Sequence, residues 1–198
     1  EKYGVMHAKA DRLVGTRIDM DPRLRSVGAT VNLMLAATLA KGTTIIENAS
    51  REPEVVDCQQ FLAACGARID GIGTTTLRIT GVERLTGTDW SAIPDRMEAG
   101  TFLIAGALTR GDVTVTPAEP ERLRIVTDLL VQAGCEIINT EDAVRLRMDA
   151  RPEAVDVMTA PYPGYPTDLQ PNTGVLMSVA RGTSVIEETI FDARFNYV

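Results

Sequence analysis

The chain has 198 residues, of which 44% are hydrophobic and 24% charged, and its formal net charge is −7. This composition is typical of a globular protein with one or two domains. The negative charge argues against nucleic acid or a membrane surface as a partner, and no apolar run approaches the roughly 18 residues that span a bilayer.

The first twenty residues have the pattern of the end of a repeated unit. Residues 5–10 and 16–20 are predicted to be short strands around a turn at Gly15. We expect the chain both to begin and to end within a repeat. A single repeat unit cannot bury its apolar face, so we expect the rest of a longer enzyme chain to be a partner of this segment.

A helix start is predicted next, at Ser26, which is a good N-cap residue. The free N–H groups at a helix start also suit an anion such as phosphate. Two interpretations of the run from Arg25 to Gly28 stay open here. It is either a plain helix cap or part of a binding site for a phosphate-bearing ligand.

One short module occurs three times along the chain, as LAATLAKGTTIIENA, AGALTRGDVTVTPA and MSVARGTSVIEETIF. Its glycines are Gly42, Gly111 and Gly182, with spacings of 111 − 42 = 69 and 182 − 111 = 71 residues. A nearly constant period indicates a repeated supersecondary unit.

Each copy predicts a helix, a stop and a strand. Glycine can take the left-handed conformation that closes the last helical turn. The preceding basic residue is expected in that turn, where a cation suits the negative end of the helix dipole. The run of Val, Ile and Thr that follows favours a strand. The three basic residues are Lys41, Arg110 and Arg181.

A second helix is predicted after each of the first two strands. Pro53 and Pro120 are helix-start signals, and Gly66 and Gly134 are stop signals. Alternating runs then predict half-buried strands, at residues 75–80 and 144–148. The repeated unit is therefore βαβαββ.

The first helix of each copy is apolar nearly all round, which predicts that it is buried. These helices are expected at residues 27–41, 97–110 and 169–181. The strands keep one polar face. The sequence thus predicts an α/β (α+β) fold of repeated βαβαββ units with buried helices, an inside-out α/β barrel that is incomplete in this chain.

A boundary between two domains is predicted near residue 93. No repeat feature crosses residues 82–95, which contain Gly87, Trp90 and Pro94. The predicted domains are residues 1–93 and 94–198. Asp95 then precedes a helix, which it can cap.

The segment at residues 160–170 interrupts the pattern with three prolines and a glycine. It predicts a rigid, irregular approach to the third buried helix. Asp168 lies at the expected helix start, where it is either an N-cap or a carboxylate held to accept a proton. The stiffness of the approach favours the second interpretation.

The three cysteines, Cys58, Cys65 and Cys135, form no Cys-x-x-Cys pair, and His7 is the lone histidine. The thiols are interpreted as small buried apolar side chains. Neither a disulfide nor a metal site is expected, and a reducing cytoplasm fits this cysteine usage.

Six stretches are specific enough to compare with known families: SVGAT, AATLAKGTTIIENA, REPE, PDRMEAGTF, PTDLQ and ETIFDARF. Together they resemble the enolpyruvyl transferase family, and in it the bacterial UDP-N-acetylglucosamine 1-carboxyvinyltransferases. The resemblance covers the whole chain. It implies two domains of three βαβαββ units each, with the active site between them, so that this chain ends one domain and begins the next.

The resemblance implies transfer of enolpyruvyl from phosphoenolpyruvate to the 3′-hydroxyl of UDP-N-acetylglucosamine, with release of phosphate. This is the first committed step of cytoplasmic peptidoglycan synthesis, on which cell shape and division depend. No cofactor and no metal are implied. The family's catalytic Cys, and the Lys and Arg that grip phosphoenolpyruvate, lie outside this segment, so we expect the segment alone to be inactive.

Residue roles follow from the same resemblance. Asp168 matches the carboxylate that deprotonates the sugar hydroxyl. Asp95 and Arg194 fall on family positions with weaker assignments, and Leu24 replaces a basic residue that the family often has. The positions implied to bind the substrate are Arg25, Ser26, Val27, Gly28, Thr167, Ile190 and Phe191.

Two alternatives stay open. The sister enzyme of the shikimate pathway shares the fold, but its characteristic glycine and lysine phosphate motifs are not found in this sequence. A module of a different class would bind a nucleotide sugar, or assemble with another chain, without catalysis. A longer gene with a Cys loop upstream would favour the enzyme.

Overall fold

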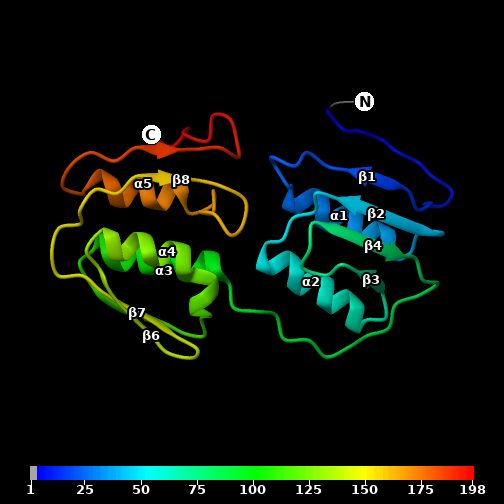
Figure 1. Cartoon of the computed structure of the whole chain (residues 1–198), viewed down its shortest axis with the longest axis horizontal. Helices are drawn as coiled ribbons and strands as arrows, with labels where there is room; N and C mark the ends of the chain where they lie inside the picture. Colours follow the sequence, from blue (N-terminus) through cyan, green and yellow to red (C-terminus); the bar gives the residue numbers. More distant parts are fainter. Residues whose placement is uncertain (1–3) are drawn as a thin grey trace. The chain divides into compact units, whose positions relative to one another are not determined.

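The computed structural model describes residues 4–198, and the chain divides into two compact units, Glu1–Ser91 and Ala92–Val198 (Figure 1). Each unit has its own hydrophobic core. The described residues form five helices and nine strands, which do not close into a barrel. None of these helices is long and apolar enough to cross a membrane.

The first unit packs two helices against a four-stranded sheet. Its elements are β1 (Arg17–Asp19), α1 (Val27–Thr38), β2 (Thr43–Glu47), α2 (Pro53–Ala64), β3 (Arg68–Asp70) and β4 (Thr76–Thr80). The strand order is β1-β2-β4-β3, with β1 parallel to β2 and the other neighbours antiparallel.

The alternating pattern of the first sheet places its apolar side chains on one face. Ile46 of β2 lies opposite Leu77 of β4, and Thr44 lies opposite Ile79. Ile46, Leu77 and Ile79 are fully buried, together with Met34 of α1. The helices therefore cover this face and form the core with it.

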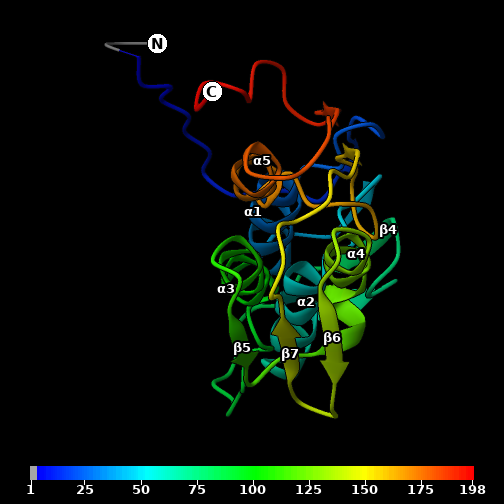
Figure 2. The ribbon, with the colours of Figure 1, turned by 90° about the vertical axis from the view of Figure 1, so that its left-hand side faces the viewer.

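The second unit contains one set of repeat elements without its first strand, and then the start of another set. Its elements are α3 (Arg96–Leu108), β5 (Asp112–Val115), α4 (Pro120–Gln132), β6 (Glu136–Asn139), β7 (Val144–Arg147), β8 (Val157–Met158), α5 (Gln170–Ser178) and β9 (Ile186–Glu187). Helices α3 and α4 lie over one face of the antiparallel sheet β5-β7-β6 (Figure 2).

The parallel pair β8–β9 flanks α5 in the same way as β1–β2 flanks α1. This recurrence confirms the predicted repeat. The core of the second unit joins its helices and its sheet, since Leu103 of α3, Leu130 of α4, Leu146 of β7 and Leu176 of α5 are all fully buried.

The predicted signals at the second helices are confirmed. Pro53 and Pro120 occupy the first positions of α2 and α4, where a missing N–H has no cost. Gly66 and Gly134 follow the helix ends with φ angles of +95° and +101°. Glycine adopts this left-handed conformation without steric strain.

The first helices end earlier than predicted, at Thr38, Leu108 and Ser178. No basic residue lies in their last turns, so the predicted interaction with the helix dipole is wrong. Lys41 and Arg181 instead form parallel bridges, with Val14 and Glu153 respectively. In these two copies the basic residue thus begins the strand pairing.

The second copy of the module also differs at its glycine. Gly42 and Gly182 have the predicted left-handed conformation, with φ angles of +89° and +107°. The helices end at Thr38 and Ser178, so these glycines do not close the last helical turn as predicted. In the second copy Arg110 takes the left-handed conformation, with a φ of +52°, and Gly111 does not.

Two further predictions are wrong for this chain. Residues 5–10 form no regular strand, since Val5 makes only an isolated bridge and residues 6–10 belong to no strand. The first helices are also not buried all round, since Leu35 is 46% exposed, Phe102 53% and Val175 48%. The sheet and the neighbouring helices of a unit cover only one side of each helix.

Candidate functional site

The Pro-rich approach to α5 is held by hydrogen bonds within the segment and to the helix. The backbone N–H of Ala160 donates to the carbonyl of Tyr165, and that of Gly164 donates to the carbonyl of Pro161. Tyr165 is buried, and its hydroxyl lies 2.5 Å from Oγ1 of Thr173 in α5. Burial raises the pKa of Tyr165 to about 12, although the bond to Thr173 acts in the opposite direction. The segment is thus fixed to the helix that follows it.

Asp168 does not cap α5, so the interpretation of this residue as an N-cap is wrong. The helix begins at Gln170, its N-cap position is Leu169, and no side chain accepts a hydrogen bond from its first turn. The side chain of Asp168 is 63% exposed, and its Oδ1 accepts a hydrogen bond of 2.7 Å from Nη2 of Arg194. Arg194, rather than the helix start, therefore orients the carboxylate.

Arg194 connects Asp168 to two other residues that the sequence analysis selected. Its Nη1 donates to Oγ1 of Thr167 over 3.1 Å, and its guanidinium carbon lies 5.3 Å from the ring centroid of Phe191. The ring face attracts the cation, so three contacts hold the arginine in one position.

Glu188 lies at the centre of this network and was not selected from the sequence. Its Oε1 accepts hydrogen bonds from Thr159 Oγ1 at 2.9 Å, from the N–H of Ile190 at 2.9 Å and from the N–H of Phe191 at 3.1 Å. Its Oε2 accepts from Thr167 Oγ1 at 2.8 Å. Burial raises the pKa of Glu188, but these four hydrogen bonds outweigh it and the net pKa is lowered.

Thr159 ties the network to the strand pair β8–β9. It is fully buried, and its Oγ1 accepts from the N–H of Thr189 at 2.9 Å. In return the Thr189 hydroxyl donates to the Thr159 carbonyl over 2.6 Å. The chain after β9 is therefore fixed beside the chain that leads to Asp168.

The structure thus brings five of the selected residues into one network within the second unit, namely Thr167, Asp168, Ile190, Phe191 and Arg194. Glu188 could be noticed in the sequence only as part of the ETIFDARF stretch, just after a predicted strand. Nothing local separates it from Glu187, which is exposed.

The start of α1, in the first unit, confirms Ser26 as an N-cap. Its Oγ accepts from the N–H of Ala29 over 3.2 Å. Val27 and Gly28 are exposed, and a Cβ added at Gly28 would meet nothing within 4 Å. Arg25 is half-buried with a φ of +41°, and in the described chain its buried Nε has no hydrogen-bond partner. The role of this run in anion binding stays a prediction.

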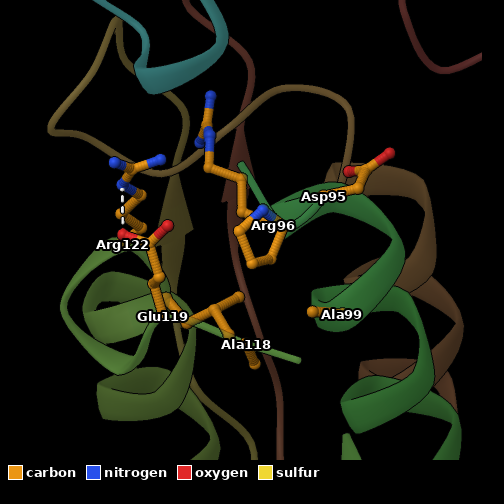
Figure 3. Close-up of a pocket in the computed structure, with 8 residues that line it drawn as sticks. Asp95, Arg96, Ala99, Ala118, Glu119 and Arg122 are labelled. Carbon is orange, nitrogen blue, oxygen red and sulfur yellow. Dashed lines mark ion pairs between the residues drawn. The ribbon is translucent and has the colours of Figure 1, made fainter. Parts of the chain in front are cut away.

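Asp95 caps α3, as expected, because its Oδ1 accepts from the N–H groups of Met97 at 2.8 Å and Glu98 at 3.0 Å. It also lines a groove of about 380 Å³ between α3 and β5. Figure 3 shows a second, adjacent pocket, where Arg122 is paired with Glu119 at 2.8 Å. Capping α3 therefore gives Asp95 a structural role.

The three thiols lack the features of a reactive nucleophile. Cys65 and Cys135 are buried and Cys58 is half-buried. Burial raises the pKa of Cys135 to about 11, and burial together with the charge of Asp57 raises that of Cys58. A catalytic thiol requires the opposite shift. The prediction of small buried side chains is confirmed for Cys65 and Cys135.

Comparison with known proteins identifies the family of this chain. The family model described as EPSP synthase (3-phosphoshikimate 1-carboxyvinyltransferase) matches residues 1–198. The chain therefore belongs to the enolpyruvyl transferase family.

Curated relatives show which members of this family the chain is similar to. The chain is 50% identical over its full length to UDP-N-acetylglucosamine 1-carboxyvinyltransferase 2 of Caldanaerobacter subterraneus subsp. tengcongensis. It is 52% identical to UDP-N-acetylglucosamine 1-carboxyvinyltransferase of Shewanella amazonensis, also over its full length. It covers 47% of each relative, so it spans about half the length of the curated relatives it matches.

Solved structures show the same fold. The enolpyruvyl transferase NikO from Streptomyces tendae superposes with a TM-score of 0.81 at 27% identity, over 95% of this chain and 47% of that one. EPSP synthase from Acinetobacter baumannii is similar in fold alone, with a TM-score of 0.52 at 18% identity, over 88% of this chain and 41% of that one.

Proposed function

We propose that this chain is part of a UDP-N-acetylglucosamine 1-carboxyvinyltransferase. The whole enzyme would transfer enolpyruvyl from phosphoenolpyruvate to the 3′-hydroxyl of UDP-N-acetylglucosamine and release phosphate, in the cytoplasm, as the first committed step of peptidoglycan synthesis. Support comes from relatives of that name at 50–52% identity over all of this chain.

The observation that carries the proposal is the orientation of Asp168. Arg194 holds its Oδ1, whereas its Oδ2 has no hydrogen-bond partner among the described residues, and the side chain is 63% exposed. A sugar hydroxyl that reaches Oδ2 can give up its proton as the new C–O bond forms. General-base catalysis of this kind needs a carboxylate within hydrogen-bond reach of the proton.

We assign the nucleotide part of the substrate to the start of α1, around Ser26. Helix starts present free N–H groups to phosphate, and Val27 and Gly28 are exposed there. The two compact units, Glu1–Ser91 and Ala92–Val198, would be the end of the first transferase domain and the beginning of the second. The thiol and the cations that act on phosphoenolpyruvate would come from the rest of the protein.

Two features of the fold support the proposal that additional polypeptide packs against these units. In the described residues β5 has no parallel neighbour, whereas β2 and β9 each have one. Apolar side chains of α1, α3 and α5 are also exposed, among them Leu35, Phe102 and Val175. We propose that the missing half of the transferase covers both features.

The test is a phosphate-release assay on the full-length protein that contains this chain. We expect release that requires both phosphoenolpyruvate and UDP-N-acetylglucosamine, and none with shikimate 3-phosphate as the acceptor. Activity with shikimate 3-phosphate alone would favour the sister enzyme. Binding of the nucleotide sugar without turnover would favour the non-catalytic module.

A further inference from the structure

The carboxylate of Glu188 binds the loop that carries Asp168 and also the chain that follows β9. Like Arg194, Glu188 contacts both segments of the proposed substrate site, and it does so through hydrogen bonds alone. Its Oε2 binds Thr167, the neighbour of Asp168, and its Oε1 binds the N–H groups of Ile190 and Phe191. We propose that Glu188 is a positioning residue, which sets the geometry of Asp168 relative to the turn at residues 188–191. This inference rests on the proposed function.

The two carboxylate oxygens of Glu188 have separate tasks. Oε1 receives three donors, which are the N–H groups of Ile190 and Phe191 and the Thr159 hydroxyl. Oε2 receives only the Thr167 hydroxyl. One oxygen therefore shapes the turn, and the other acts on the loop that carries Asp168.

The contact with Thr167 also sets the direction of that hydroxyl. Because Thr167 donates its proton to Glu188, a lone pair of its Oγ1 faces Nη1 of Arg194. Arg194 is then held by Thr167 and Asp168 at the same time. Glu188 thus influences the carboxylate of Asp168 through two intermediates, without touching it.

The separate tasks allow two substitutions to be distinguished. In Glu188→Gln the amide oxygen can keep the three donors at the Oε1 position, but the amide nitrogen then faces Thr167 as a donor. Thr167 loses its acceptor, and the contact with Arg194 weakens. Glu188→Ala removes both tasks. The matched control is Glu187→Gln, because Glu187 is the exposed neighbour in β9.

The experiment uses the full-length transferase, with steady-state kinetics beside amide hydrogen exchange of the peptide that contains residues 189–191. For Glu188→Gln we expect exchange close to wild type and kcat lower by about 10-fold, the usual worth of a hydrogen bond to a charged group. For Glu188→Ala we expect amide exchange at Ile190 and Phe191 to be at least 10-fold faster, and the KM for the nucleotide sugar to rise. We also expect kcat to be lower by about 10²-fold, since a small misplacement of a catalytic group costs that much. Glu187→Gln should match wild type in every readout.

The proposal is overturned if Glu188→Ala keeps the wild-type exchange rate and kcat. It is also overturned if the loss of kcat only follows the unfolded fraction seen in melting curves while Glu188→Gln stays fully active, because Glu188 is then a structural residue. A wild-type enzyme without transferase activity, together with faster exchange in Glu188→Ala, would refute the proposed function and support the role of Glu188 in holding the turn.

Discussion

At the scale of single residues, the candidate site depends on polar side chains held by several contacts each. Tyr165 is the most deeply buried titratable group of the approach to Asp168. It is 4% exposed, and its hydroxyl contacts Thr173. Since this contact fixes the Pro-rich segment to α5, its loss should affect stability before it affects chemistry.

Ionisation of Tyr165 should make the free energy of unfolding depend on pH in the alkaline range. Its pKa is raised to about 12 in the folded protein, mainly by burial, from an unfolded value near 10. The neutral phenol therefore makes its full contribution to the free energy of unfolding below pH 10, and this contribution is lost as the pH rises toward 12. Between these values the free energy of unfolding should fall more steeply in wild type than in Tyr165→Phe, by up to about 1.4 kcal/mol per pH unit.

Urea titrations of the two proteins at pH 9 to 12 measure this difference. Tyr165→Phe should also cost about 0.5–1.5 kcal/mol near neutral pH, through the lost bond to Thr173. Identical slopes above pH 10 would show that the phenol ionises as freely in the folded protein as in the unfolded chain.

At the scale of elements, the structure separates apolar helix positions that the sequence could not distinguish. Leu103 of α3 is fully buried, whereas Leu35 of α1 is 46% exposed. Leu103→Ala should destabilise the protein by about 2–5 kcal/mol, the usual cost of a cavity in a packed core. Leu35→Ala should cost less than about 1 kcal/mol in this chain, since exposed substitutions are usually mild.

Chemical denaturation of both variants of the 198-residue chain measures this contrast. Equal losses would mean that the two helices are covered alike, which contradicts the one-sided packing in the structure. In the full-length protein we expect the cost of Leu35→Ala to rise, because the missing half of the transferase is proposed to cover α1.

The repeat explains why the order of elements was predictable from the sequence. Proline at the helix starts, glycine after the helix ends and alternation in the strands act locally, so Pro53, Gly66 and Leu77 behave as predicted. Details set by contacts between distant segments were not predictable. Lys41 begins a strand bridge with Val14 rather than ending a helix, and Asp168 is oriented by Arg194 rather than by α5.

Glu188 shows the same limit within the site. Its importance comes from hydrogen bonds to residues up to 29 positions away in the chain, which single-sequence patterns do not reveal. Asp168 was found because a local feature, the stiff Pro-rich approach, marked it. A local pattern marked Asp168 and the family resemblance marked Arg194, but neither marked Glu188.

At the scale of the whole molecule, the chain holds part of a proposed site in each of two compact units. The three thiols are free, with Cys65 and Cys135 buried. The groups proposed to act on phosphoenolpyruvate would come from elsewhere in the protein. We therefore predict that the isolated 198-residue chain releases no phosphate when both substrates are present, even where it folds. Phosphate release by the purified chain would contradict the proposal that the groups acting on phosphoenolpyruvate come from elsewhere in the protein.

We propose that the carboxylate of Asp168 accepts the proton of the sugar hydroxyl. Asp168→Asn in the full-length enzyme keeps an oxygen for Arg194 but removes the base. The exposed ion pair with Arg194 contributes at most about 1 kcal/mol, so the melting temperature should change little. Asp149→Asn is the control, because Asp149 is an exposed carboxylate outside the network.

The decisive measurement is kcat of Asp168→Asn beside its melting curve. We expect kcat to fall by about 10²–10⁴-fold, the usual worth of general acid–base catalysis. Binding of UDP-N-acetylglucosamine should weaken less, and the melting temperature should stay at the wild-type value. A variant that melts normally and turns over at the wild-type rate would show that Asp168 is not the general base.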